Sequence, residues 1–415
     1  MKKIFAAFIC TFFILSVCQA EEISFEPCGD TEQIISNVYF DDLYKIPHIS
    51  FAQDCVALGL MFGDGQNFNA ESGMTNENAL RILYRTAGRE DEGYAAAYNT
   101  ELRAAAGLGD FDWLSSGDGF YLLARRDGLI TDAEFVSAYT DPASTLARAT
   151  PATVNNFVKW FCLLHGIKTS GSLSGNFSID SAYRAYYSAL KNYYILSDED
   201  IRTVSAYYTL TNDIAAYILK KAESRIIGKI GIQRITGRIT KVYEHTEADS
   251  IRREITVLSN NAYYTLKSNS SKNGAFFNVR SDYPVLSKSG TDLSGSLREN
   301  DRITVYIKDG KILFVRNETV NKNAEYLGAP LIFSGKFYVY DYTKNELVLG
   351  GVKKSDKDID GYMKCYLNLD TKFYYNGNII DKYTLNTEFA DRECTVFMLP
   401  SVHGGMERVY SIVFE

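Results

Sequence analysis

The sequence has few of the residues that most enzymes use for catalysis or metal binding. Its 415 residues include only four histidines, which lie far apart: His48, His165, His245 and His403. A catalytic Ser–His pair or a histidine metal site would need such side chains to converge. The chain also lacks a glycine-rich phosphate loop ending in Lys-Ser or Lys-Thr, and it has no Gly-x-Ser-x-Gly elbow. The sequence therefore predicts a protein that is not an enzyme and that uses no cofactor or metal ion.

Cysteine is scarce as well. Only five cysteines follow the first 20 residues, and none belongs to a Cys-x-x-Cys pair, so a structural zinc site is not expected. In an exported protein Cys28 could bridge to Cys55, and Cys365 to Cys394. The alternative is that all five are buried free thiols, and Cys162, inside an apolar helical run, is expected in the core.

Long hydrophobic runs are absent except at the N-terminus. Two lysines at positions 2 and 3 precede an apolar run over residues 4–18, and Gln19-Ala20 stands before two glutamates. This order is typical of a secretory signal peptide over residues 1–20, cleaved after Ala20. A membrane anchor is the alternative, but the run is shorter than the ~20 residues that span a bilayer. We expect a secreted protein whose mature chain has no transmembrane segment.

Positive charge is scarce in the first half of the mature chain. Residues 21–225 contain 28 acidic and 16 basic residues, a net charge of −12, whereas residues 226–415 carry a net charge of +3. Binding of nucleic acid needs a surplus of lysine and arginine to neutralise phosphates. The composition therefore argues against a nucleic-acid partner and leaves an envelope polymer, a cation or another protein.

Three stretches of the acidic half repeat one helical pattern, at residues 33–92, 93–166 and 167–226. Each opens with a Phe-Asp or Phe-x-x-Asp segment and reaches a second helix through a polar break containing threonine. The openings are Phe40-Asp41-Asp42, Phe111-Asp112-Trp113 and Phe177-Ser178-Ile179-Asp180; the second helices are expected to start at Thr75-Asn76-Glu77-Asn78, Thr150-Pro151-Ala152-Thr153 and Thr211-Asn212-Asp213-Ile214. A repeat of this kind predicts modules that pack on one another.

One further segment fits the start of a second helix. Thr131-Asp132-Ala133-Glu134 shares the threonine and the glutamate three residues later. We interpret it as the turn after the first helix of its repeat, because Ser197-Asp198-Glu199-Asp200 stands at the equivalent place in the third repeat. The sequence leaves that choice open.

The second half alternates apolar and polar residues, which is typical of β-strands. Strands are expected at 235–243, 253–258, 302–307 and 311–315, with a tight turn at Asp309-Gly310. Residues 335–340 and 391–397 repeat parts of this series. The sequence thus predicts two related barrel- or sandwich-like units, at 230–320 and 330–415. The expected fold class is α+β and multidomain: an N-terminal all-α, pseudo-threefold domain followed by a C-terminal all-β region.

The three helical repeats resemble S-layer homology modules, which anchor surface proteins to bacterial cell walls. In that family each module opens with Phe-x-Asp and begins its second helix at Thr-Arg-Ala-Glu. Threonine caps the helix, and the arginine helps to hold an anionic wall polysaccharide. The positions that match the motif here are Asp42, Thr75, Asn76, Thr150, Thr211 and Asn212.

The chain departs from the family pattern at the arginine. That position holds Asn76, Pro151 and Asn212, so the helix caps are kept and the cations are lost. Five other arginines could substitute for these cations, and the alternative is that each is a solvated surface side chain: Arg81, Arg85, Arg125, Arg126 and Arg184. The resemblance implies attachment to wall polysaccharide or S-layer assembly at the cell surface. The alternatives are an adhesin or scaffold that uses protein contacts, with the modules as architecture only, and a hydrolase with a site in the β region.

Overall fold

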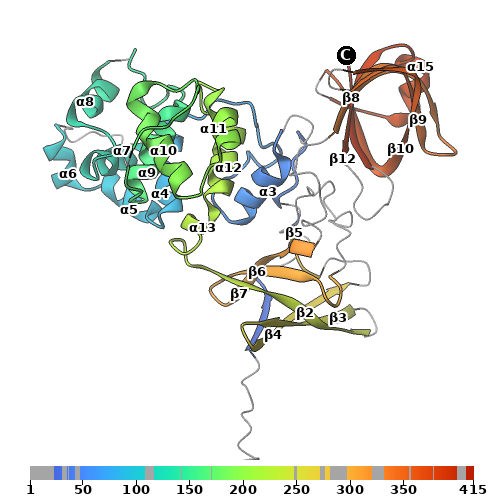
Figure 1. Ribbon diagram of the computed structural model, residues 1–415, viewed down its shortest axis with the longest axis horizontal. Coiled ribbons are helices and arrows are strands. Elements are labelled where there is room, and N and C mark those ends of the chain that lie inside the picture. Colours follow the sequence, from blue (N-terminus) through green and yellow to red (C-terminus); the bar gives the residue numbers. More distant parts are fainter. Residues whose placement is uncertain are drawn as a thin grey trace, which may run out of the picture.

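The computed structural model describes most of the chain after residue 22. The described residues are 23–29, 35, 37–42, 47–107, 116–141, 143–169, 171–246, 250–271, 276–280, 297–319, 331–354, 357–376, 378–399 and 408–415. The predicted signal peptide and the segment Phe111-Asp112-Trp113 lie outside them. Figure 1 shows the helices of residues 49–226 gathered on one side, a first sheet below them, and a second sheet, which carries α15 (Leu385–Glu388), set apart on the other side.

Residues 49–226 form the helical unit. Its helices are α3 (Ile49–Ala57), α4 (Asn76–Thr86), α5 (Glu90–Ala97), α6 (Thr100–Ala105), α7 (Ser116–Arg126), α8 (Asp132–Thr140), α9 (Val154–Leu164), η2 (Ser181–Tyr183), α10 (Arg184–Asn192), α11 (Asp198–Ser205), α12 (Asn212–Lys221) and α13 (Glu223–Ile226). One continuous apolar cluster runs through the helices of all three repeats. None of the described helices combines the length and apolar character needed to cross a membrane.

Three extended segments meet at the centre of the helical unit, one before each of α4, α9 and α12. The backbone N–H of Met74 donates to the carbonyl of Leu210, Leu210 donates to Ala152, and Ala152 donates to Met74, each at 2.8 Å. The three bonds close a ring in which every segment gives one bond and accepts one. We call these three residues the central ring, and it relates the three segments by an approximate threefold axis.

A second set of three backbone hydrogen bonds also links the three segments in a cycle. These bonds involve residues two positions before or after the residues of the central ring. Asn76 donates its backbone N–H to Thr150 at 2.9 Å, and Asn212 donates to Ser72 at 3.2 Å. Val154 donates to Tyr208 at 3.0 Å. Residues 72–76, 150–154 and 208–212 are therefore structural equivalents.

This equivalence corrects the predicted start of the second helix in the middle repeat. Thr75 and Thr211 cap α4 and α12, as predicted. The cap of α9, however, is Thr153, whose hydroxyl accepts from Asn156 N at 3.1 Å. The prediction of Thr150 as the cap and Pro151 as the first helical residue is wrong by three residues. Both threonines fit a cap locally, but the central ring needs Ala152 in an extended conformation.

Thr131 and Ser197 occupy matching places, as the preferred interpretation required. Each caps a helix, α8 and α11, and each forms a capping box with the acidic residue three positions later, Glu134 and Asp200. Such a box satisfies two backbone N–H groups that a helix start leaves unpaired.

The β region contains two closed sheets, each a small barrel. The strands of the first sheet are β1 (Ile23–Pro27), β2 (Ile232–Thr246), β3 (Ser250–Ser259), β4 (Ala262–Ser271), β5 (Val279–Arg280), β6 (Arg302–Lys308) and β7 (Lys311–Asn317); those of the second are β8 (Leu331–Asp341), β9 (Glu346–Lys354), β10 (Lys357–Tyr375), β11 (Asn378–Ile380), β12 (Glu393–Leu399) and β13 (Arg408–Phe414). The turn between β6 and β7 has positive φ at both Asp309 and Gly310, which confirms the predicted tight turn.

The two barrels share one strand order. In the first, β2, β3 and β4 form an antiparallel meander, β6 pairs with β2, and β7 pairs with β6. In the second, β8, β9 and β10 form the meander, β12 pairs with β8, and β13 pairs with β12. The internal duplication expected from the sequence is therefore present in the pairing of the strands.

The predicted division into an all-α N-terminus and an all-β C-terminus is wrong. Strand β1, at the start of the described chain, belongs to the first barrel. The second barrel in turn contains η3 (Lys382–Thr384) and α15 (Leu385–Glu388) between β11 and β12. Leu385 of α15 and the neighbouring Phe389 are buried in the core of that barrel. Helices are thus not confined to the N-terminal part of the chain, and strands are not confined to the C-terminal part.

None of the five described cysteines forms a disulfide bond. Cys28 is exposed, whereas Cys55, Cys162, Cys365 and Cys394 are buried. Neither of the two disulfide bonds considered from the sequence is formed. Burial raises the pKa of Cys162 to about 12 and that of Cys394, next to Cys365, to about 12. These thiols are therefore protonated core side chains at neutral pH.

A buried ion cluster joins the helical unit to the first barrel. The carboxylate of Asp54 on α3 is fully buried and contacts Arg280 of β5 at 2.8 Å, Lys220 of α12 at 2.8 Å, and Arg316 of β7. Lys220 also contacts Glu223, which accepts a hydrogen bond from Tyr306 of β6. Burial alone would raise the pKa of the Asp54 carboxyl, but the three cations hold it well below its usual range.

Candidate functional site

The asparagines at two of the positions compared with the S-layer homology motif bind protein backbone. Asn76, fully buried at the start of α4, donates from its side-chain amide to the carbonyls of Thr145 at 2.9 Å and Ala147 at 3.0 Å. Both carbonyls belong to the segment that leads into the second repeat's extended strand. The amide of Asn76 therefore ties the first repeat to the second.

Asn212 makes the same contact from the third repeat to the first. Its side-chain amide donates to the carbonyls of Phe68 at 3.2 Å and Asn69 at 3.1 Å. In the second repeat the equivalent residue is Val154, which has no side-chain donor. We call Asn76 and Asn212 the clamp asparagines, because each holds the loop of a neighbouring repeat.

Asp42 fixes the same loop that Asn212 holds. It is 8% exposed, and its carboxylate accepts from the backbone N–H groups of Phe68 at 2.9 Å and Asn69 at 2.8 Å. Asp64 adds a local turn by accepting from Gln66 N and Asn67 N. Of the six residues predicted to bind a ligand, Asp42, Asn76 and Asn212 are used as internal ties, Thr75 and Thr211 cap helices, and the backbone carbonyl of Thr150 accepts from Asn76.

We expect Asn76→Ala to lower the free energy of unfolding by about 1–3 kcal/mol, because the buried Asn76 side chain would lose both of its hydrogen bonds to the backbone carbonyls of Thr145 and Ala147. Asn212→Ala should lower it less, since that site is partly exposed. Asn76→Asp is the matched control: it keeps the size of the side chain but turns an acceptor toward the carbonyls, and it should cost at least as much as alanine. Urea unfolding curves measure all three, and wild-type stability in the two Asn76 variants would contradict the clamp.

Most of the five arginines considered above as substitutes for the motif cation are engaged within the chain. Arg85 makes a two-pronged contact with Glu90, at 2.6 and 2.5 Å. Arg184 donates to the carbonyls of Leu173 and Gly175. Further pairs are Arg125–Asp132, Arg126–Asp127, Arg148–Glu77 and Arg148–Asp118. An anionic polymer would have to compete with carboxylates for these guanidinium groups.

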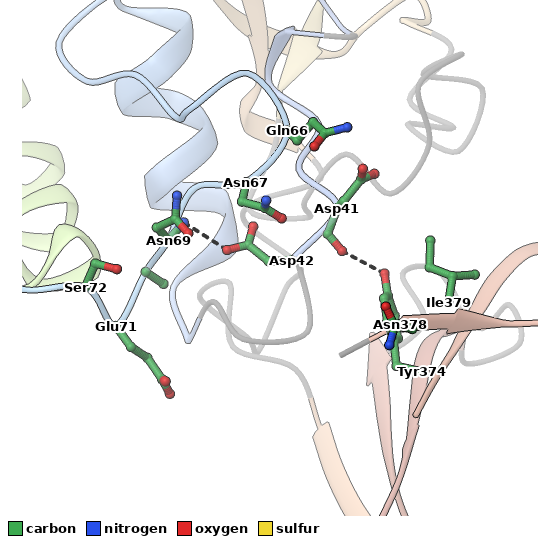
Figure 2. Close-up of a pocket in the computed structure, with 11 residues that line it drawn as sticks. Asp41, Asp42, Gln66, Asn67, Asn69, Glu71, Ser72, Tyr374, Asn378 and Ile379 are labelled. Carbon is green, nitrogen blue, oxygen red and sulfur yellow. Dashed lines mark hydrogen bonds between the residues drawn. The ribbon is translucent and has the colours of Figure 1, made fainter. Parts of the chain in front are cut away.

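A cleft of about 550 Å³ lies between the first repeat and the second barrel (Figure 2). Its lining residues are Asp41, Asp42, Gln66, Asn67, Asn69, Ala70, Glu71 and Ser72 from the repeat and Tyr374, Asn378 and Ile379 from the barrel. The hydroxyl of Tyr374 donates to the backbone carbonyl of Asp41 at 2.8 Å across the cleft. Lysine and arginine are missing from the described lining. Carboxylates and amides can bind hydroxyl groups or cations, and the carboxylates, of which Asp41 is paired with Lys372 at 3.7 Å, disfavour an anionic polymer.

The structure contains a histidine–carboxylate pair that the sequence did not reveal. His48 Nδ1 lies 2.7 Å from the Asp213 carboxylate, and the backbone N–H of His48 donates to the other oxygen. The two residues are far apart in the chain, so no local sequence pattern predicts their contact. Among the described residues no serine, threonine or cysteine side chain is hydrogen-bonded to His48. The pair fixes the start of α3 against α12.

Metal ligands do not gather in the parts of the chain that the structure describes: no group of three or more His, Cys, Asp or Glu side chains could hold an ion there.

Comparisons with known proteins add no family. No protein-family model matches the chain, and no curated protein matches it significantly. Weak likenesses exist among solved structures. They are described as "Structural mimicry for functional antagonism" (11% identity, 44% of this chain, 92% of that chain, TM-score 0.13), "Molecular basis for abrogation of activation of pro-inflammatory cytokines" (11%, 44%, 92%, 0.11) and "Crystal structure of Ifi202 HINa domain in complex with 20bp dsDNA" (9%, 44%, 95%, 0.12). At these TM-scores the likenesses support no statement on fold or function.

Proposed function

We propose that this chain is a secreted, non-enzymatic scaffold or adhesin of the bacterial cell envelope that works through protein contacts. In this proposal the threefold helical unit is the frame that holds two small barrels. The observation that carries it is the use of Asn76 and Asn212 as clamps between repeats. At two of the three positions where S-layer homology modules present a cation, this chain has an asparagine whose side chain forms hydrogen bonds within the protein.

Electrostatics supports protein partners over an anionic wall polysaccharide. The first half of the mature chain has a net charge of −12, and its cleft next to the second barrel is lined by carboxylates and amides. A polymer that carries carboxylates or phosphates would be repelled there. A protein surface can supply the lysines and arginines that such a face attracts.

Sedimentation with purified cell walls tests this function. The chain without residues 1–20 is mixed at low salt with three preparations: walls stripped of protein but keeping their secondary polymer, stripped walls without that polymer, and walls that keep their surface proteins. We expect sedimentation with the third preparation alone. Sedimentation with stripped walls that depends on the polymer would overturn the proposal in favour of wall anchoring.

Asn212→Arg is the matched control, because it returns the family's cation at the more exposed clamp. Polymer-dependent sedimentation of this variant, with none for the wild type, would show that the assay detects the family mechanism when its cation is present.

A further inference from the structure

The first barrel is completed by a strand from the other end of the chain. Strand β1 pairs in parallel with β4 over Ile23–Phe25, where Phe25 lies opposite Leu266. It then pairs in parallel with β7, where Glu26 lies opposite Lys311 and Pro27 opposite Ile312. The remaining strands of this sheet come from residues 232–317. Strand β1 therefore fills a slot whose walls are β4 and β7.

The second barrel has the same strand order but no strand that corresponds to β1. There β10 and β13, the equivalents of β4 and β7, pair directly with each other in parallel, from Leu367 opposite Val409 to Tyr375 opposite Phe414. In the described part of the first barrel β4 and β7 do not pair, and β1 lies between them. The slot is thus an addition to one of two otherwise matching barrels.

Strand β1 is held mainly by its backbone. Ile23 is 46% exposed, and Ser24 and Glu26 are exposed as well. Phe25 is the side chain of β1 that packs against the core cluster of the barrel, and its ring stacks with Tyr264 at 6.3 Å. Few buried apolar contacts mean that such a strand can open without unfolding the barrel. Two strand edges would then be left unpaired, and such edges take up an extended chain.

We propose that β1 is exchanged between molecules, so that the slot between β4 and β7 takes up residues 23–27 of a second copy of this chain. The ion pair between Glu26 and Lys311, at 3.1 Å, sets the register equally well within one chain or between two. Each copy gives one strand and accepts one, and such a head-to-tail contact builds rings or open chains of molecules. This inference rests on the proposed scaffold function and names its partner.

Cysteine pairing across the slot tests the exchange. Glu26→Cys and Lys311→Cys are made in separate full chains without residues 1–20, each with Cys28→Ser to remove the exposed native thiol. The two variants are refolded together, oxidised and separated on a non-reducing gel. We expect a covalent product of two chain masses. A double variant that carries both cysteines tests the pairing of β1 with β7 itself. We expect it to form the disulfide bond between positions 26 and 311, either within one chain or between successive chains.

A matched control replaces Lys311→Cys by Lys241→Cys, an exposed position on β2, which does not pair with β1. Equal amounts of covalent dimer with both partners would show random collision and overturn the exchange. A double variant that bridges only within its own chain, with no mixed dimer, would overturn it as well. If the double variant formed no disulfide bond, the result would contradict the pairing of β1 with β7, and the proposal would be wrong. The assay contains no wall material, so its outcome is independent of the sedimentation test.

Discussion

Asp54→Ala is expected to lower the free energy of unfolding by about 3–5 kcal/mol, the range measured when one partner of a buried ion pair is removed. The alanine would leave Arg280, fully buried, and the mostly buried Arg316 and Lys220 without their shared carboxylate. Because these cations come from the first barrel and the helical unit, we also expect the two bodies to unfold in separate transitions. Calorimetry and urea unfolding measure both effects.

Arg252→Ala is the matched surface control for Asp54→Ala. Arg252 pairs with Glu254 at 2.6 Å in the same barrel, but its side chain is 47% exposed. Exposed pairs contribute about 0–1 kcal/mol, so this change should be small. Equal losses for the two substitutions would contradict a special role for the buried cluster.

The low pKa of Asp54 adds a pH test. The stabilisation that the ionised Asp54 contributes is present above pH 3.8, the ordinary pKa of an aspartate, and is lost only as the pH falls below that value.

Ala152→Pro is expected to cost about 3 kcal/mol or more and to separate the three repeats. Proline has no backbone N–H, so the bond from Ala152 to Met74 in the central ring would be lost, and the proline ring would press on the Met74 carbonyl. Since each member of the ring contacts the other two segments, the loss is not confined to one repeat. Far-ultraviolet circular dichroism against urea follows the helical unit directly.

Thr209→Pro is the control that the repeat itself supplies. Residues 73, 151 and 209 are equivalent, and the middle repeat already has proline there, at Pro151. Thr209 lies between the two residues whose backbone groups bond to the second repeat, Tyr208 and Leu210. We expect this variant to stay close to wild type. A loss as large as that of Ala152→Pro would mean that any proline in these segments is harmful, and the ring would not be the cause.

Sequence reasoning succeeded where the signal is local. Threonine before an apolar helical stripe predicts a cap, and Thr75 and Thr211 are caps. Alternating apolar residues predict strands, and the duplicated strand order of the barrels follows from that pattern. The error in the middle repeat arose because Thr150 and Thr153 both fit a cap. The choice between them is made by bonds to residues of the other two repeats, which no local pattern contains.

The candidate site was only half predictable, for the same reason. The sequence shows that Asn76 and Asn212 stand at positions compared with the motif arginine, but the contacts of both side chains depend on carbonyls in another repeat. Likewise, the residues of the ion cluster around Asp54 come from five separate elements. Strand β1 has only five residues, and this pattern is too short to predict that β1 pairs with β4 at Tyr264. Contacts between distant segments decided both the fold class and the site.

The place of β1 in the first barrel affects the order of folding during synthesis. A chain that emerges N-terminus first releases β1 well before β4 and β7, the strands between which it must lie. Until residue 317 has emerged, the first barrel is incomplete and its earliest strand has no template. Contacts of such large sequence separation form late, because a long loop must close first. We therefore expect the helical repeats to be structured before the barrel beneath them closes.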